Sequence, residues 1–542
     1  EHPREPVTAT RPAGGADGAL DEGAVFGDAV FEGAVLEGAV AADAPEQDNP
    51  DADESTGSAP RRRWPDGGLG VLVAGLLAFV AARPLTDNSF LTHLATGRLI
   101  LEQGVPSTNP FLYSARIYPG SAEFPIPSWL WSVVLGGVDA VAGGAGLRVL
   151  TAALAGVLGL VVVRLTRPVT GGERTLLSVV LPATCVVITL MPFVNARPQL
   201  PGYLFLALTV LVATERRSGW WLVAVFALWA NVHGTWFYGL AVLGLLVVAQ
   251  VLDERRIGTR RLGWLVGAVV GVVLGGLLQP HPFETVILPL EQLGDERARR
   301  AIANYVEWKP AGFDHPLTWL LIAMGLVALF AALGLRQGPD GSDGPRRWGV
   351  LLGAVGLVAM GMSAGRLLPL AVITLVPWVA MGLQGLRGLP LPSGGIPRVL
   401  ASLGVLLGVV ALVWSTSNPA YDLSRYPVTA IDWLAERGLM GSADVKVASH
   451  DYVGNYLDWR YEDRANTFVD DRPGTDALLD YAALQDLTDG WRDALGRAEP
   501  DVIVWETERP LTDELREPAW FDAGRFGEFT VFCRSSIADR CR

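Results

Sequence analysis

Cysteines and catalytic signatures are scarce in this chain of 542 residues, which has three cysteines. Cys185 lies within an apolar run, whereas Cys533 and Cys541 lie close together near the carboxyl end, where an exported domain could link them. Their spacing permits a disulfide without deciding whether one forms. No Walker, Rossmann-glycine, zinc or serine-hydrolase signature is present, so nucleotide hydrolysis and proteolysis have no support.

Charge is also sparse, and it is unevenly placed. Charged residues make up 18% of the chain and hydrophobic residues 50%, and the net charge of −13 falls almost entirely within the first sixty residues. The acidity therefore describes a tail and not a binding face, and no basic patch predicts a nucleic-acid partner. The apolar residues come in long uncharged runs, which predicts a polytopic membrane protein.

We expect residues 1–63 to form a disordered, acidic tail in the cytoplasm. Within it, residues 23–42 (GAVFG DAVFE GAVLE GAVAA) repeat every five residues and resemble a pentapeptide-repeat solenoid. Four repeats are few for a self-supporting coil, so a docking element and a flexible tail with duplicated sequence both stay open. No apolar signal segment precedes the first span, and we expect that span to act as its own targeting signal.

About eleven apolar runs could cross a bilayer, which needs about twenty residues each. They lie near residues 67–84, 147–165, 175–193, 199–214, 219–232, 235–252, 263–279, 317–335, 347–363, 367–385 and 398–415. The segment 127–143 is short, carries Asp139 and ends in glycines, so we interpret it as re-entrant or interfacial. The sequence thus predicts an α-helical membrane domain of about eleven to twelve spans over residues 64–416.

Arginines set the expected orientation of these spans. Arg61, Arg62 and Arg63 precede the first run, and the positive-inside rule then keeps the amino end in the cytoplasm. The other arginine-rich loops fall on the same side if segment 127–143 does not cross. We therefore expect a loop over residues 85–126 on the outer face of the cell membrane.

After residue 416 the composition becomes that of a soluble domain. Helical patterns alternate with short β-rich runs; the helices are expected near 427–438, 476–484 and 487–497, and the strands near 445–449, 467–470, 501–505 and 529–533. This alternation predicts a small α/β domain over residues 417–542. An odd number of crossings places it outside the cell membrane.

Asp87 and His93 follow the first span directly, at the predicted water boundary. A carboxylate there is a candidate for meeting a substrate. Apolar residues over 88–103 are spaced for an amphipathic helix that lies along the membrane surface. Asp87 would lie at or near its amino end, and helix capping is the alternative explanation for this residue.

Further motifs follow in a characteristic order. They are the helix and turn HLATGRLILEQGVPSTNPF, the tryptophan pair in PIPSWLW, RPQ at 197–199, WANVHG at 229–234 and DDR at 470–472. Together with the acid in the first outer loop and the many spans, this order resembles the GT-C superfamily of membrane glycosyltransferases. The resemblance covers nearly everything after residue 65 and is closest to largely uncharacterised bacterial members with an extracytoplasmic C-terminal domain.

The resemblance implies transfer of a sugar, with inversion, from a polyprenyl-phosphate carrier to a glycan, lipid or protein acceptor of the cell envelope. It implies Asp87 as the general base, with His93 and His233 as further catalytic residues. Arg197 and Arg366, at the ends of spans, are expected to bind the leaving phosphate, because bidentate arginine suits phosphate. Acceptor binding is assigned to the remaining polar candidates, Glu307, Asp470, Asp471 and Arg472.

Each assignment has a structural alternative. Arginines at span ends also reach lipid headgroups, Glu307 lies in a charge-rich loop, and Asp-Asp-Arg-Pro-Gly at 470–474 is a good turn sequence. Members of the superfamily commonly show two acids before the loop histidine, whereas Asn88 and Ser89 follow Asp87 here. We therefore assign no metal ligand and no cofactor, and a divalent metal ion stays an open alternative.

A second hypothesis, from another class, is a catalytically silent membrane scaffold that recruits envelope-assembly enzymes. The missing second acid beside Asp87 favours this alternative. A transporter would need ionisable residues near the middle of spans, and Asp139 is the nearest case, so transport has little support.

Overall fold

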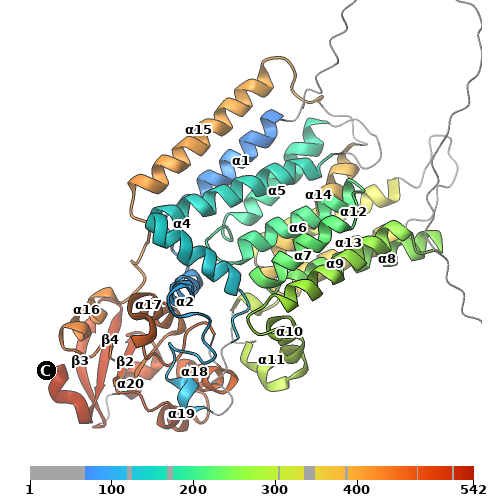
Figure 1. Ribbon diagram of the computed structural model, residues 1–542. Coiled ribbons are helices and arrows are strands. Elements are labelled where there is room, and N and C mark those ends of the chain that lie inside the picture. The colour runs from blue at the N-terminus through green and yellow to red at the C-terminus, as the bar shows by residue number, and fades with distance from the viewer. Residues whose placement is uncertain are drawn as a thin grey trace, which may run out of the picture. The chain divides into compact units, whose positions relative to one another are not determined.

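The computed structural model describes residues 67–118, 125–167, 175–302, 306–334, 348–384, 389–442, 444–472, 474–515 and 518–542. The predicted tail over 1–63 and its repeat at 23–42 lie outside the described residues. Up to residue 417 the described chain is almost entirely helical, and beyond it helices surround a small sheet (Figure 1).

Most helices before residue 417 coincide with the apolar runs of the sequence. They are α1 (Gly67–Ala81), α4 (Trp129–Leu165), α5 (Leu176–Leu190), α6 (Gln199–Thr214), α7 (Trp220–Val232), α8 (Trp236–Glu254), α9 (Thr259–Leu277), α12 (Pro316–Gly334), α13 (Trp348–Met362), α14 (Leu368–Gln384) and α15 (Ile396–Ser417). Shorter elements connect them: α2 (Ser89–Gln103), α3 (Ser114–Ile117), α10 (Glu284–Gly294), α11 (Glu296–Ile302) and the 3-10 turns η1 (Val306–Trp308) and η2 (Gly365–Leu367).

Within the described part of the chain, five helical segments are long and apolar enough to cross a membrane, which is fewer than the eleven to twelve predicted. They are Trp129–Leu165, Trp236–Glu254, Thr259–Leu277, Gly365–Gln384 and Ile396–Ser417. Helices α5, α6 and α7 have 13 to 16 residues, because polar or proline-containing turns such as NARPQ and NVHG interrupt the apolar runs there. A helix of about 15 residues rises only about 22 Å, less than the hydrocarbon thickness of about 30 Å.

The segment at 127–143, expected to be re-entrant or interfacial, forms the first arm of α4. This 37-residue helix is interrupted at Gly143, whose φ of 58° falls in the left-handed region that glycine adopts readily. The first arm packs closely on α2, because a Cβ on Gly97 would overlap the carbonyl of Ser132. The second arm is the apolar run predicted at 147–165.

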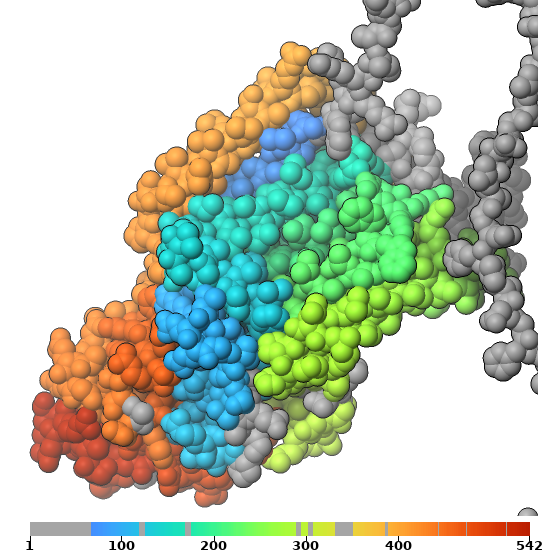
Figure 2. Space-filling model, in the orientation of Figure 1, coloured from blue at the N-terminus to red at the C-terminus, as the bar shows by residue number. Residues whose placement is uncertain are grey.

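Helix α2 forms where predicted but does not lie freely along a membrane surface. Its apolar residues Phe90, Leu91 and Leu94 are buried, and so are Thr92 and Thr96. The helix lies between α4 and α17 (Asp451–Tyr461) of the C-terminal region, which we define as residues 417–542. Figure 2 shows the blue surface of this segment between the teal membrane helices and the orange C-terminal region. Protein contacts therefore cover the first turns of the helix, whereas Leu101 and Glu102 near its carboxyl end are exposed.

The C-terminal region contains a mixed four-stranded sheet of order β1-β2-β4-β3. Its strands are β1 (Val447–Ser449), β2 (Val502–Glu506), β3 (Trp520–Phe526) and β4 (Phe529–Arg534). β1 pairs with β2 in parallel, and the other pairings are antiparallel. Three predicted strands are present, but the run 467–470 contributes only isolated bridges at Thr467. β3 was not predicted, because Asp522 and Gly524 interrupt its apolar pattern at a bulge.

Helices cover this sheet. They are α16 (Val428–Glu436), α17, α18 (Thr475–Asp486), α19 (Trp491–Ala498) and α20 (Pro510–Glu514), with the 3-10 turns η3 (Glu462–Arg464) and η4 (Ser535–Cys541). The helices predicted at 427–438, 476–484 and 487–497 correspond to α16, α18 and α19. Cys533 and Cys541 form a disulfide, and Cys185 is buried with a free thiol.

Candidate functional site

Asp87 lies at the start of α2 and is bound to Arg197. Nε of Arg197 donates to Oδ1 of Asp87 over 2.5 Å, and Nδ2 of Asn195 donates to Oδ2 over 3.1 Å. Oδ1 also accepts the backbone N–H of Phe90 over 3.3 Å, which is a helix-capping hydrogen bond. Asp87 is thus both a cap and the partner of an arginine. Because a carboxylate offers about four acceptor positions, about one remains for a further donor.

Glu307 joins the two arginines that the sequence singled out. Nη1 of Arg197 donates to Oε2 of Glu307 over 3.0 Å, and Nη1 of Arg366 lies 3.5 Å from Oε1. The guanidinium of Arg366 also lies 4.4 Å from the ring centre of Trp308. Burial opposes ionisation of Glu307, but Arg366 and Arg197 outweigh it and lower the pKa of this carboxyl. Glu307 is therefore more than part of a solvated charge run.

The Asp-Asp-Arg turn of the C-terminal region docks on α2. The hydroxyl of Ser89 donates to Oδ2 of Asp471. Nη1 of Arg472 donates to the hydroxyl of Thr96 over 2.9 Å, and Nη2 reaches Oδ2 of Asp470 over 3.2 Å. The turn therefore lies within two residues of Asp87, although nearly 400 residues separate them in the sequence.

Carboxyl groups at this contact are buried together. Asp470 and Asp458 are fully buried, and Oδ1 of Asp471 has no hydrogen-bond donor among the described residues. Burial and the charge of Asp470 raise the pKa of Asp471 to about 7, and the same two causes raise the pKa of Asp458. Asp471 consequently exchanges a proton near neutral pH, a property suited to general acid–base work.

His93 faces the same place from α2. Its Nδ1 lies 3.1 Å from the hydroxyl of Ser132. Burial lowers the pKa of His93 to about 3, with further lowering by Arg472 and Arg197. His93 is therefore uncharged at physiological pH and acts through hydrogen bonding.

His233, in the WANVHG motif after α7, is also buried and neutral. Burial and then Arg366, His93 and Arg197 lower its pKa well below the usual value. The backbone N–H of Thr235 donates to Nδ1 of His233 over 3.3 Å. The neutral ring therefore carries its proton on Nε2, which can donate a hydrogen bond.

The structure thus brings the predicted site residues into one group, which we call the charged cluster. Direct contacts connect Asp87, Arg197, Glu307 and Arg366, and others connect α2 with the Asp-Asp-Arg turn. The charges of the cluster arginines also contribute to the lowered pKa of each histidine. The members are Asp87, His93, Arg197, His233, Glu307, Arg366, Asp470, Asp471 and Arg472.

The other motifs of the sequence hold this cluster in place. The indole of Trp131 donates to the carbonyl of Ala196, next to Arg197, over 2.8 Å. The indole of Trp129 donates to Asn231 of WANVHG over 2.8 Å, and Asn231 donates to the carbonyl of Gly275. The tryptophan pair therefore ties the start of α4 to the two loops that carry Arg197 and His233.

Sequence reasoning missed several partners. Asn195 and Asn455 are hydrogen-bonded to the cluster, and Asp458 supplies a third buried carboxyl beside Asp470 and Asp471. Asn195 stands within the NARPQ motif, which was a usable signal. Asp458 and Asn455 lie on α17, a helix that was not predicted, so no sequence pattern pointed to them.

Among the described residues, no three His, Cys, Asp or Glu side chains are arranged to hold a metal ion. No protein-family model matches the chain, and a search of curated proteins finds no significant match either. The geometry of the charged cluster and the resemblance of its motifs are therefore the observations that bear on function.

Proposed function

We propose that this chain is a membrane glycosyltransferase that transfers a sugar from a polyprenyl-phosphate carrier to an extracytoplasmic acceptor of the cell envelope. The observation that supports it is the charged cluster, in which motif residues from distant segments meet at the ends of apolar helices. In this proposal the amino end is cytoplasmic, the C-terminal region is extracytoplasmic, and the lipid carrier reaches the cluster from the membrane.

The two arginines suit a lipid phosphate. Arg197 and Arg366 are held on either side of the Glu307 carboxylate, at 3.0 and 3.5 Å. Glu307 occupies the place of an anion between two guanidinium groups, so a phosphate that displaces it finds its donors already oriented. Glu307 serves here as an internal anion, and the acceptor-binding role expected from the sequence is replaced by this one.

The chemical step needs a base and a stabilised leaving group. The acceptor hydroxyl oxygen attacks the anomeric carbon, its proton passes to a carboxylate, and the bond from that carbon to the phosphate oxygen breaks. The anionic lipid phosphate leaves on the opposite side of the sugar, with inversion. The arginines stabilise the charge that develops on the phosphate, and His233 can donate to it through Nε2.

Two carboxylates can take the proton. Asp87 is the base implied by the motif order, and it keeps about one free acceptor position. Asp471 has its pKa raised to about 7 and an oxygen without a hydrogen-bond donor among the described residues. Ser89 connects the two, because it lies two residues after Asp87 and donates to Asp471. The missing second acid of the sequence motif is thus supplied in space by the C-terminal region.

The scaffold hypothesis has its own supporting observation. Arg197 already donates hydrogen bonds to Asp87, Asn88 and Glu307. Arg472 joins α2 to the C-terminal region. A network whose charges neutralise one another is also what a purely structural latch requires.

Release of free polyprenyl phosphate distinguishes the transferase hypothesis from the scaffold hypothesis. Purified protein in lipid nanodiscs is given polyprenyl-phosphate-linked hexose and pentose donors with an envelope extract, and the released lipid phosphate is measured by mass spectrometry. Loss of the base in Asp87→Asn should lower the rate by about a hundredfold or more, and the surface variant Asp493→Asn should not change it. If Asp471→Asn alone lowers the rate, Asp471 is the base; if the wild type releases nothing beyond buffer, the scaffold hypothesis replaces the transferase.

A further inference from the structure

A cleft of about 510 Å³ opens in the C-terminal region, and none of the residues that line it belongs to the charged cluster. It lies between α19, the end of α20 and the adjoining ends of β3 and β4. β3 is one edge of the sheet, and β1, which leads to the charged cluster, is the other. The cleft is therefore a separate place and not an extension of the cluster.

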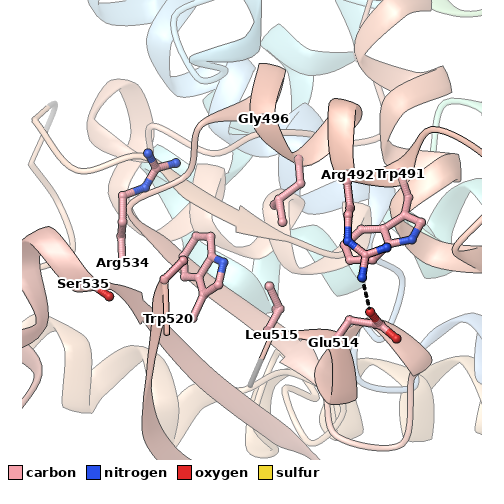
Figure 3. A pocket seen from close by; sticks show the side chains of 10 residues that line it. Trp491, Arg492, Gly496, Glu514, Leu515, Trp520, Arg534 and Ser535 are labelled. Atoms are coloured by element: carbon pink, nitrogen blue, oxygen red, sulfur yellow. Dashed lines mark hydrogen bonds and ion pairs between the residues drawn. The ribbon is translucent and has the colours of Figure 1, made fainter. Parts of the chain in front are cut away.

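Tryptophan and arginine are paired on both walls of this cleft (Figure 3). On one wall the guanidinium of Arg492 lies 4.2 Å from the ring centre of Trp491. On the other wall the guanidinium of Arg534 lies 5.7 Å from the ring centre of Trp520. Both indoles are only partly buried against the core of the region, so part of each remains open to the cleft.

The floor of the cleft is apolar and its rim is charged. Leu515 lies buried between the two walls. At the rim, Nη2 of Arg492 donates to Glu514 over 2.7 Å, so these two charges neutralise each other. Arg534 donates from Nε to the carbonyl of Pro500, and its terminal amines have no hydrogen-bond partner in the described part of the chain. The cleft thus presents one uncompensated positive charge beside an indole.

We propose that this cleft binds an anionic saccharide, a short stretch of glycan that carries carboxylate or phosphate groups. A sugar ring has an apolar C–H face that packs on indole and a polar edge that receives hydrogen bonds, and the cleft offers both kinds of surface. The free amines of Arg534 suit a carboxylate or phosphate oxygen.

The size of the cleft favours a glycan over a folded partner. Its volume falls in the range of small-ligand sites, about 300 to 1,000 Å³. A stable protein interface would instead bury about 800 Å² on each side, which ten lining residues do not supply. If the chain is the transferase proposed above, the bound glycan is part of the acceptor chain, held at a place separate from its reacting end; this last step alone rests on the proposed function.

Calorimetric titration of the full chain in nanodiscs tests the binding. The probes are tetragalacturonate, which carries carboxylates, neutral maltotetraose, and tetraglutamate, an anion that is not a sugar. The wild type should bind tetragalacturonate at least tenfold more tightly than either of the others. Equal binding of tetraglutamate, or no heat with tetragalacturonate at millimolar concentration, overturns the proposal.

Variants on the two walls locate the site. Arg534→Gln and Trp491→Ala come from different elements, and each should weaken tetragalacturonate binding tenfold or more. Arg525→Gln removes the same charge from β3 outside the cleft and should leave binding unchanged. Arg197→Gln, which disrupts the proposed phosphate site, should also bind the glycan like the wild type. Failure of the glycan-site proposal can therefore be told apart from failure of the proposed transferase function. If both wall variants bind normally, the glycan site is not this cleft.

Discussion

Helices α1 and α15 pack against each other through glycine, whereas the charged cluster joins its segments through paired charges. A Cβ on Gly404 of α15 would overlap the backbone of α1 near Val71, and a Cβ on Gly75 of α1 would overlap Gly404. In the cluster, Arg197 alone binds three side chains from two other segments. The first contact depends on the absence of side chains and the second on their chemistry.

The glycine contact can join helices, whereas the charged cluster can also hold charged groups in a fixed geometry. Close backbone packing of small residues is a common way to join helices where lipid gives no hydrophobic driving force. It carries no specificity for a ligand. Buried ion pairs add little stability over apolar packing but fix the geometry of charged groups, which is what phosphate binding and proton transfer need.

The largest effect is expected from removing the central arginine of the cluster. Arg197→Gln leaves Asp87 and Glu307 without a principal counter-charge, and breaking such a pair costs about 3 kcal/mol or more. The unfolding midpoint, followed by tryptophan fluorescence in nanodiscs, should fall by several degrees. Arg256→Gln, which breaks an exposed pair with Glu254, should shift it little. Equal midpoints for both variants would mean that the cluster does not join the segments.

A bulky side chain at the glycine contact should destabilise the chain by a different route. Gly404→Leu forces α1 and α15 apart, and overpacking of this kind costs about 1 to 3 kcal/mol. Gly408→Leu on the same helix is the control, because a Cβ there meets nothing within 4 Å. If the contact is purely structural, Gly404→Leu lowers the unfolding midpoint while lipid-phosphate binding per folded molecule stays normal. If the two glycine variants behave alike, close packing at Gly404 does not stabilise the chain.

The disulfide should stabilise the C-terminal region without affecting the cluster. Cys533 and Cys541 are separated by eight positions in the sequence, for which chain-entropy arguments give about 2.5 kcal/mol. The double substitution Cys533→Ser/Cys541→Ser should increase hydrogen exchange in β4 and leave exchange in α2 unchanged. Increased exchange in both elements would show that the sheet and the cluster unfold together.

A further test of the cluster uses pH. The pKa of Asp471 is raised to about 7 in the fold, above its usual value near 3.8, so the folded chain holds a proton that the unfolded chain releases over this interval. The free energy of unfolding should therefore decline as the pH rises from about 4 to 7. Asp471→Asn should flatten this dependence, measured as the unfolding midpoint across buffers, whereas the exposed Asp493→Asn should keep it. An unchanged slope in Asp471→Asn would contradict the raised pKa.

The sequence predicted the helices of the glycine contact, α1 and α15, more completely than it predicted the contacts of the charged cluster. Apolar runs were enough to place α1 and α15, since hydrophobicity along the chain is a local property, but counting every apolar run as a span overstated how many helices are long enough to cross a membrane. Motif order identified Asp87, Arg197, His233 and the Asp-Asp-Arg turn. The docking of that turn on α2 was not predictable, because it depends on contacts between Ser89 and Asp471 that no local pattern encodes.

Two other predictions differ from the structure, because each depends on contacts between distant segments. Glu307 looked like one member of a charge run, since sequence does not show that two distant arginines flank it. The amphipathic spacing of α2 predicts a helix that lies along the membrane surface. In the structure, Thr92 and Thr96 on its other side are buried against the C-terminal region. A pattern that separates apolar from polar faces does not tell whether protein, lipid or water covers them.

Binding of polyprenyl phosphate to the purified chain tests the central claim most directly. Native mass spectrometry or calorimetry in nanodiscs is used with the lipid phosphate and with the corresponding uncharged polyprenol. The account predicts that the phosphate binds and the polyprenol does not, and that Arg366→Gln weakens binding at least tenfold while Arg256→Gln has no effect. Equal binding of phosphate by wild type and Arg366→Gln would contradict it, and the charged cluster would then be a structural latch.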